Sequence, residues 1–309
     1  MEQLTFVATP KRSIREALVE ASSFLESCGV MEPQHNAKLL LEHVLGLNGT
    51  AYYMALPEPF PEDRRAAWEE AVNRKGNGVP AQYIIGEQEF YGLSFEVTPA
   101  VLIPRPETEL LVEEVLKQAG QMKSAGQEKS ADQEKSAEQA SGPMVLDIGT
   151  GSGAIAVTLA LKSPDWHVYA SDISPEALEI AVRNAKRLGA RVDFRLGNLL
   201  EPFAGLAPDI IVSNPPYIPA KDIETLQPEV RDYEPRTALD GGADGLKPYR
   251  IMMEQLTLLA APPRIIAFEL GMGQAEEVAE MLRKAGYWEQ IITVPDLAGI
   301  DRHVLGVSL

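Results

Sequence analysis

From Met144 to the C-terminus, short apolar runs alternate with helical stretches, and this alternation restricts the possible folds more than any other feature of the chain. Runs such as MVLDIG and DIIVSN are largely apolar, which is typical of strands buried on both faces of a sheet. Buried strands that alternate with helices predict a mostly parallel sheet covered by helices, the α/β class of fold. The last two runs, WEQIITVP and HVLGVSL, predict an antiparallel hairpin because only the short segment PDLAGIDR connects them.

Residues 1–85 lack this pattern and instead predict a small helical bundle. Ser13 and Glu16 have the spacing of a capping box at the start of a helix, and apolar residues then recur at helical spacing. Two more amphipathic stretches follow, one over residues 34–45 and one that begins near Pro61. By itself the bundle carries no recognisable chemistry.

A predicted β-hairpin and hinge, residues 86–105, connect the bundle to the α/β region. The segment QEFYGLSFEV has the two-residue period of paired strands on either side of the turn signal Tyr91-Gly92. Pro104 and Pro106 then favour an extended segment that leads into a helix, since proline suits the first turn of a helix. The predicted α/β domain therefore spans residues 106–309.

A low-complexity insert, residues 118–142, interrupts the predicted α/β domain. Its central part, residues 123–140, is a hexapeptide written three times as KSAGQE, KSADQE and KSAEQA. The repeat has no apolar face, so burial cannot offset the entropy that is lost when the segment becomes ordered. We expect a solvated, flexible spacer rather than an extension of the preceding helix, and we assign it no function.

The charge balance makes nucleic acid an unfavourable partner. The chain has 28 Lys and Arg against 45 Asp and Glu, a formal charge of −17. A surface of this kind repels phosphate backbones at long range. Stable binding to nucleic acid is therefore not expected, although a local basic patch is compatible with this charge.

Cysteine, histidine and apolar runs exclude several other classes of protein. Cys28 is the single cysteine, which excludes an intramolecular disulfide and a four-cysteine zinc site. The four histidines are scattered and none has the spacing of metal ligands, so we expect no metal site. No apolar stretch has the length of a signal peptide or approaches the ~18 residues that suggest a membrane span. We expect a cytoplasmic protein without a membrane segment.

A glycine-rich loop, Asp147-Ile148-Gly149-Thr150-Gly151-Ser152-Gly153, lies between a predicted strand and a predicted helix. Glycines permit a positive φ and a close approach of backbone to ligand, and open α/β sheets bind ligands at this edge. Asp172 ends the next predicted strand, where its carboxylate can accept hydrogen bonds from both hydroxyls of a ribose. The expected cofactor-binding residues are Gly149, Thr150, Gly151, Ser152, Gly153 and Asp172. The pattern fits a nicotinamide dinucleotide or S-adenosyl-L-methionine, and the third glycine favours the second.

A second loop, Asn214-Pro215-Pro216-Tyr217, follows the predicted strand IIVS. An amide or exocyclic amine nitrogen is a poor nucleophile because its lone pair is delocalised. The Asn214 side-chain oxygen and the Pro215 carbonyl can accept its two N–H hydrogens and aim the nitrogen at a methyl group. We expect Asn214, Pro215 and Tyr217 to be catalytic, all four residues to bind substrate, and Asn214 also to contact the cofactor. With the glycine loop, the motif predicts methyl transfer from S-adenosyl-L-methionine to a planar nitrogen.

Over nearly its whole length the chain resembles the peptide chain release factor glutamine methyltransferases, the HemK/PrmC family. Several of the shared segments are absent from DNA methyltransferases. The segments that carry the resemblance are FYGL at 90–93, VLIPRPETE at 101–109, DIGTGSG at 147–153, NPPYI at 214–218, EVRDYEP at 229–235, ALDGG at 238–242, DGL at 244–246 and DLAGIDR at 296–302.

The resemblance implies a class I methyltransferase fold, Rossmann-like, with an N-terminal helical bundle that helps to dock the substrate. The implied reaction is methylation of the N5 atom of the glutamine in the Gly-Gly-Gln loop of class 1 release factors. The resemblance also implies that Asn198 and Leu199 contact the adenine, where relatives often have an aspartate and an aromatic residue. The segment Arg105 to Glu109 has two readings: a capped, salt-bridged helix start, or a hinge that lies over the cofactor and shapes the substrate channel.

Three other functions share some of these features. An adenine-N6 nucleic-acid methyltransferase has the same two loops, but the net charge and the lack of a basic stripe disfavour it. A non-enzymatic adaptor that binds release factors is disfavoured by the intact Asn214 and glycines. A nicotinamide oxidoreductase is disfavoured because no His, Tyr-Lys pair or Cys is placed as a partner for hydride transfer.

Overall fold

The computed structural model describes residues 4–130 and 142–308 and divides into two compact units. The helical unit comprises Met1–Glu87 together with a distant segment, Gln227–Tyr233. The α/β unit comprises Gln88–Leu226 and Glu234–Leu309. Within the described ranges, no helix is both long enough and apolar enough to cross a membrane.

Within the described residues, the helical unit contains the three helices that the sequence predicts and four short ones that it does not. Ser13 and Glu16 form the predicted capping box, in which the Ser13 side chain accepts from the Glu16 amide and the Glu16 carboxylate accepts from the Ser13 amide. Trp68 is fully buried at the centre of the apolar core. The elements are α1 (Ile14–Ser27), α2 (Pro33–Leu45), α3 (Gly49–Ala55), η1 (Glu62–Arg64), α4 (Arg65–Gly76), α5 (Ala81–Ile85) and α9 (Pro228–Tyr233).

The segment that carries α9 joins the helical unit through polar contacts. The Lys75 side chain, 2% exposed, forms an ion pair with Glu229, and the Tyr233 hydroxyl donates to the Asn77 carbonyl at 2.9 Å. A buried ammonium without a partner would be costly, so Glu229 explains how Lys75 is tolerated in this core. The chain therefore leaves the α/β unit after Leu226 and returns to it at Glu234.

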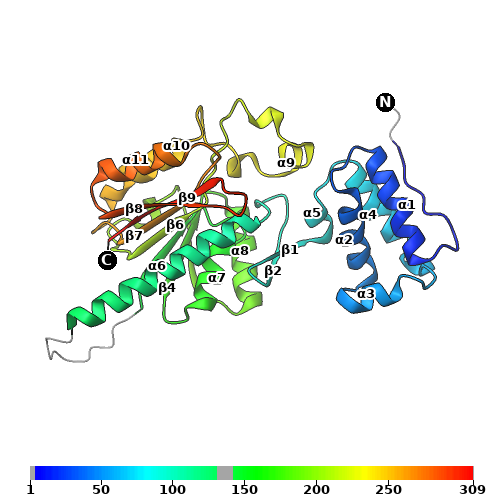
Figure 1. The fold of residues 1–309 in the computed structure, drawn as a ribbon, viewed down its shortest axis with the longest axis horizontal. Coiled ribbons are helices and arrows are strands. Elements are labelled where there is room, and N and C mark those ends of the chain that lie inside the picture. The colour runs from blue at the N-terminus through cyan, green and yellow to red at the C-terminus, as the bar shows by residue number, and fades with distance from the viewer. Residues whose placement is uncertain (1–3, 131–141, 309) are drawn as a thin grey trace. The chain divides into compact units, whose positions relative to one another are not determined.

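The α/β unit is built on a seven-stranded sheet in the order β5-β4-β3-β6-β7-β9-β8 (Figure 1). Neighbours from β5 to β7 are parallel, and β9 pairs antiparallel with both β7 and β8. This confirms the predicted α/β fold of the class I methyltransferase type. The strands are β3 (Met144–Ile148), β4 (His167–Asp172), β5 (Val192–Leu196), β6 (Ile210–Ser213), β7 (Ile265–Glu269), β8 (Gln290–Pro295) and β9 (Asp301–Val307).

Successive side chains along a strand point to opposite faces of the sheet and pack in two separate apolar cores. In β3, Val145 packs with α6 and α7 on one face, whereas Leu146 packs with α10 and α11 on the other. Figure 1 shows α10 and α11 on one side of the sheet and α6, α7 and α8 on the other. The remaining helices of this unit are α6 (Pro106–Ser130), α7 (Ala154–Lys162), α8 (Pro175–Leu188), η2 (Glu201–Phe203), η3 (Ile223–Thr225), η4 (Arg236–Ala238), α10 (Lys247–Gln255), η5 (Leu256–Leu258) and α11 (Ala275–Ala285).

The predicted hairpin is present as β1 (Glu87–Phe90) and β2 (Leu93–Glu96). Tyr91 and Gly92 at its turn have φ values of +55° and +73°, as a tight turn between two twisted strands requires. The helix that follows is longer than expected, because α6 runs to Ser130 and so includes the first part of the low-complexity insert. Lys, Glu, Gln and Ala are strong helix formers, which explains this continuation. Residues 131–141 of the insert lie outside the described residues.

Candidate active site

The glycine loop and the Asn-Pro-Pro-Tyr loop lie side by side because the strands that precede them are neighbours. β3 pairs in parallel with β6, and Ile148 at the end of β3 is opposite Ser213 at the end of β6. The Ser213 hydroxyl donates to the Ile148 carbonyl at 2.6 Å and fixes this alignment. The strand order reverses between β3 and β6, and such a switch point is where open α/β sheets bind ligands.

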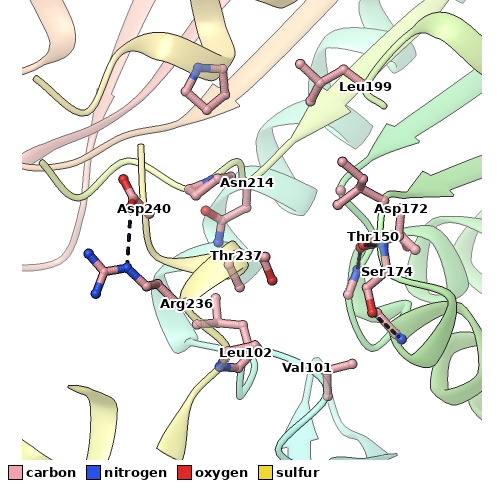
Figure 2. Close-up of a pocket in the computed structure, with 18 of the residues that line it drawn as sticks. Val101, Leu102, Thr150, Asp172, Ser174, Leu199, Asn214, Arg236, Thr237 and Asp240 are labelled. Atoms are coloured by element: carbon pink, nitrogen blue, oxygen red, sulfur yellow. Dashed lines mark hydrogen bonds and ion pairs between the residues drawn. The ribbon is translucent and has the colours of Figure 1, made fainter. Parts of the chain in front are cut away.

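A cavity of about 1110 Å³ opens at this edge of the sheet, and all of its lining residues belong to the α/β unit. In Figure 2, Leu199, Asp172, Thr150 and Ser174 lie on one side, Arg236, Thr237 and Asp240 on the other, and Asn214 between them. The predicted site residues that line the cavity are Gly149, Thr150, Gly151, Ser152, Asp172, Asn198, Leu199, Asn214 and Pro216. The volume is slightly above the range of about 300–1,000 Å³ that is usual for one small ligand, so it is sufficient for a cofactor and part of a second reactant.

The glycine loop is held against the end of β4 by its own backbone. The amides of Gly149 and Thr150 both donate to the Ser171 carbonyl, at 2.8 and 2.9 Å. Gly151 has a φ of +55°, and a Cβ added there would meet no atom within 4 Å. Gly153 has a φ of +83° and does not line the cavity; a Cβ there would lie 3.2 Å from the Ala181 Cβ. Gly153 therefore permits close packing of α7 on α8, while Gly151 keeps backbone open to the cavity.

Asp147, at the end of β3, supports the loop from below. Its side chain is fully buried, and one carboxylate oxygen accepts from the Thr150 hydroxyl at 2.6 Å and from the Ala156 amide at 3.1 Å. Burial raises the pKa of Asp147 to about 7, against the opposing effect of these two hydrogen bonds. The sequence predicts no role for this residue, although it is the first residue of the glycine motif.

Asp172 is placed to hold a diol. Its two carboxylate oxygens accept from the Gly151 amide at 2.8 Å and from the Ser174 amide at 2.9 Å. Burial raises the pKa of Asp172, and backbone amides, among them those of Ser174 and Gly151, oppose the rise. Each oxygen keeps acceptor capacity, so this carboxylate can accept the two hydroxyl hydrogens of a ribose in the cavity.

Asn198 and Leu199 lie where the resemblance places the adenine contact. Leu199 has a φ of +53°, an unfavourable conformation for a branched side chain, and its carbonyl accepts from the Ser171 hydroxyl at 3.0 Å. The Asn198 amide group donates to Glu201 at 3.1 Å. Leu199 therefore presents an apolar surface to the cavity, and Asn198 is partly engaged with a neighbour.

Asn214 is fixed from behind by two buried polar residues. Asn214 Nδ2 donates to Thr108 Oγ1 at 3.1 Å, and Thr108 Oγ1 donates to Glu269 Oε2 at 2.6 Å. Glu269 is almost completely buried, and burial raises its pKa to about 7 against the lowering effect of the Thr108 hydrogen bond. The sequence motif predicts a role for Asn214 but for neither of these partners.

The other two residues of the motif are not among those that line the cavity. Pro215 is buried, and Tyr217 packs with the apolar cluster that contains α10 and α11. A Cβ added at Gly271 would lie 3.2 Å from the Tyr217 ring, and burial raises the pKa of Tyr217 to about 12. The expected roles of Pro215 and Tyr217 in catalysis and substrate binding stay predictions.

The segment Arg105 to Glu109 forms an ion pair and also contributes to the lining of the cavity. Pro104, Arg105 and Thr108 line the cavity, while Arg105 also forms an ion pair with the buried Glu234. Glu109 accepts from the Tyr91 amide at 2.8 Å and so ties the helix start to the hairpin. The cavity is also lined by a stretch whose place in the site was not predicted from the sequence, residues 235–238 with Asp240, Gly242 and Ala243. The ALDGG motif at 238–242 belongs to this stretch, but its residues indicate no particular chemistry and so do not predict a place in the site.

Fold and site together define a methyltransferase of the α/β class. A family model described as "Methyltransferase small domain" matches residues 135–228, which include both loops. The catalytic domain of hMettl16, solved in complex with MAT2A 3′UTR hairpin 6, superposes with a TM-score of 0.53 over 77% of this chain and 82% of that one. At 16% identity this likeness shows a shared fold.

More similar proteins narrow the class to one family. A family model described as "PrmC N-terminal domain" matches residues 16–86. The release factor glutamine methyltransferase of Bacillus cereus is 43% identical over 293 residues, which cover 94% of this chain and 98% of that protein. Those of Geobacter sulfurreducens and Bacillus subtilis are 42% and 41% identical and cover 95% of this chain and 96% and 97% of their own. The chain belongs to the release factor glutamine methyltransferase family.

Proposed function

We propose that this protein methylates the N5 atom of the glutamine in the Gly-Gly-Gln loop of class 1 peptide chain release factors, with S-adenosyl-L-methionine as methyl donor. The observation that carries the proposal is the juxtaposition of the Asn214 carboxamide with the glycine loop and Asp172 around one cavity. Full-length relatives that carry the name release factor glutamine methyltransferase support the choice of substrate. An adenine-N6 nucleic-acid methyltransferase would need the same juxtaposition but receives no support from these relatives.

The residues present fit this cofactor. Asp172 supplies a carboxylate for the ribose, Gly151 exposes backbone, and Leu199 offers an apolar face for the adenine. When bound, S-adenosyl-L-methionine supplies a methyl group on a positively charged sulfur.

The chain's own contribution is to hold and orient the target amide. Asn214 Oδ1 and the Pro215 carbonyl would accept the two N–H hydrogens of the glutamine and hold its nitrogen in line with the methyl group. Two aimed oxygens also stabilise the positive charge that develops on the nitrogen. No base is needed before attack, because the proton can leave the nitrogen after the methyl group has been transferred.

We further propose that the helical unit helps to dock the release factor and that the reaction takes place in the cytoplasm, where translation occurs. The family match over residues 16–86 supports a role for this unit that is specific to the family. Docking away from the chemistry would use binding energy from the rest of the protein substrate to place a single glutamine.

A side-by-side methylation assay tests the substrate. The protein is incubated with labelled S-adenosyl-L-methionine and, separately, with a class 1 release factor, duplex DNA and RNA. We expect label in the release factor alone, and mass spectrometry should locate a single methyl group on the glutamine of the Gly-Gly-Gln peptide. Label in nucleic acid and none in the release factor would reject the proposal.

Replacement of Asp172 by alanine should weaken cofactor binding, because the ribose loses its acceptor. Hydrogen bonds to a charged group contribute roughly 1–3 kcal/mol, which corresponds to about a 5- to 150-fold rise in Kd. Calorimetric titration with S-adenosyl-L-methionine measures the change. Asp193→Ala is the matched control, since Asp193 is an exposed carboxylate on β5 that does not line the cavity. An Asp172→Ala protein that binds as tightly as the control would contradict the ribose assignment.

A further inference from the structure

Three polar side chains from three separate elements form a chain of hydrogen bonds that ends at Asn214. Asn214 directly follows β6, Glu269 is the last residue of β7, and Thr108 lies in the first turn of α6. β6 and β7 pair in parallel with Ser213 opposite Phe268, so the next residue of each strand emerges at the same level. Thr108 and Glu269 are only 4% and 2% exposed. Water therefore competes little for their hydrogen bonds.

The ionised carboxylate at one end fixes the direction of every bond in this chain. A carboxylate can only accept, and a threonine hydroxyl has a single hydrogen to give. Because Thr108 gives that hydrogen to Glu269 at 2.6 Å, the Thr108 oxygen can only accept from its other neighbour. The Asn214 side chain must then turn its NH2 group towards Thr108, as observed at 3.1 Å.

The direction matters because the two ends of a carboxamide have nearly the same shape but opposite hydrogen-bonding character. If the Asn214 amide rotated by half a turn, its NH2 group would face the NH2 group of the target and two donors would oppose each other. Nothing in the shape of asparagine alone prevents this rotation. The selection has to come from the groups behind it.

We propose that Thr108 and Glu269 are positioning residues that set the polarity of this hydrogen-bond chain and so keep Asn214 Oδ1 turned towards the substrate amide. The inference rests on the proposed function, because it takes Asn214 Oδ1 as an acceptor for the target nitrogen. It assigns the pair to orientation, which should affect turnover and leave binding of the cofactor unchanged.

The ionisation of Glu269 provides a further test, which is the dependence of turnover on pH. Burial raises its pKa to about 7, so the carboxylate form prevails above that pH and the protonated form below it. A protonated Glu269 can donate to Thr108, which allows the hydroxyl to donate to Asn214 and removes the selection. Turnover should therefore rise with pH through about 7. The ionisable groups that act on Glu269 or lie beside it are Glu107 of α6, Arg302 and His303 of β9, Tyr217, and Tyr249 of α10, whose hydroxyl donates to the Glu269 carbonyl.

The experiment compares Thr108→Val, Thr108→Ser and Glu269→Gln with the wild type on a release factor substrate. Valine keeps the shape of threonine but lacks the hydroxyl, serine keeps the hydroxyl, and glutamine can donate as well as accept. Thr158→Val is the matched control, because Thr158 of α7 is fully buried and its hydroxyl has no partner among the described residues. Cofactor affinity is measured by calorimetry for each variant as the check that the site is folded.

We expect kcat to fall at least about tenfold in Thr108→Val, since small misplacements of reacting groups cost this much or more. Cofactor affinity should be unchanged, Thr108→Ser should recover most of the turnover, and Thr158→Val should match the wild type. In Glu269→Gln the rise of kcat near pH 7 should disappear. Because burial also raises the pKa of Asp147 to about 7, the comparison of Glu269→Gln with the wild type, not the wild-type profile alone, is diagnostic.

Three results would overturn the inference, and the first two are a Thr108→Val protein that turns over as fast as Thr158→Val and a Glu269→Gln profile that rises near pH 7 as steeply as that of the wild type. Equal losses in Thr108→Val and Thr108→Ser would also overturn it, because packing and not the hydroxyl would then be responsible. If the proposed function itself is wrong, the experiment gives a different result. In that case the wild-type protein itself would leave the release factor unmethylated.

Discussion

Replacement of Asn214 by alanine should abolish most methyl transfer and leave cofactor binding intact. The side chain lines the cavity beside the glycine loop, and its hydrogen-bond partners, Thr108 at 3.1 Å and Glu269, belong to α6 and β7 and not to the cofactor-binding loop. Loss of a preorganised group that stabilises developing charge typically costs about 10²–10³ in kcat. We expect a loss of this size, since Asn214 supplies one of the two acceptors that hold the target nitrogen.

Single-turnover methylation of a release factor, with cofactor affinity measured on the same protein, separates the two effects. An equal loss in turnover and in affinity would mean that the substitution disturbed the glycine loop. Unchanged turnover would show that the motif does not hold the target amide. Asn214→Asp is a useful companion, because it would place a second carboxylate against Glu269 and should also be inactive near neutral pH.

The sequence contained most of what determines the sheet. Short apolar runs and capping residues are local signals, and each predicted strand from Met144 onward is present in the structure. The neighbouring positions of β3 and β6 follow from the fold class, and they bring two motifs more than 60 residues apart to one edge. Gly151, Asp172 and Asn214 could be predicted because each residue type is required by its own chemistry.

Long-range polar pairs could not be predicted in this way. Lys75 and Glu229 are separated by 154 residues, and nothing around either residue indicates that α9 belongs to the helical unit. Thr108 lies in a segment that the sequence predicts to start a helix, and the sequence predicts no role for Glu269. Their pairing depends on the packing of α6 against the end of β7, which no local pattern encodes.

In the low-complexity insert, the helix propensity of the residues and the lack of an apolar face favour opposite structures. The absence of an apolar face argued for a flexible spacer, but the residues themselves favour a helix and α6 continues to Ser130. Tyr217 shows that a motif does not by itself indicate how each of its side chains packs. Its place in the same motif as Asn214 predicts contact with the substrate, which stays a prediction, but the motif does not indicate that the ring packs with the apolar cluster that contains α10 and α11.

Replacement of Trp68 by alanine should strongly destabilise the helical unit. Trp68 is fully buried and its ring centroid lies 6.4 Å from that of Phe6 and 6.3 Å from that of Phe60. Removal of a buried tryptophan side chain costs about 3–5 kcal/mol, a large share of the roughly 5–15 kcal/mol by which whole domains are stable. Urea unfolding of the full chain should show this loss. Val19→Ala, at a position 60% exposed on α1, is the matched control and should change stability by no more than about 0.5 kcal/mol.

The same variant tests whether the helical unit docks the substrate. The cofactor-binding residues and both apolar cores of the sheet lie in the α/β unit, so affinity for S-adenosyl-L-methionine should change little. If docking through the helical unit supplies binding energy, kcat/KM for an intact release factor should fall at least about tenfold. Activity on a short peptide that carries the Gly-Gly-Gln sequence should stay near the wild-type value, since a peptide cannot use the distant surface. A variant that has lost its helical unit but methylates the intact release factor as well as the wild type would show that docking takes place elsewhere.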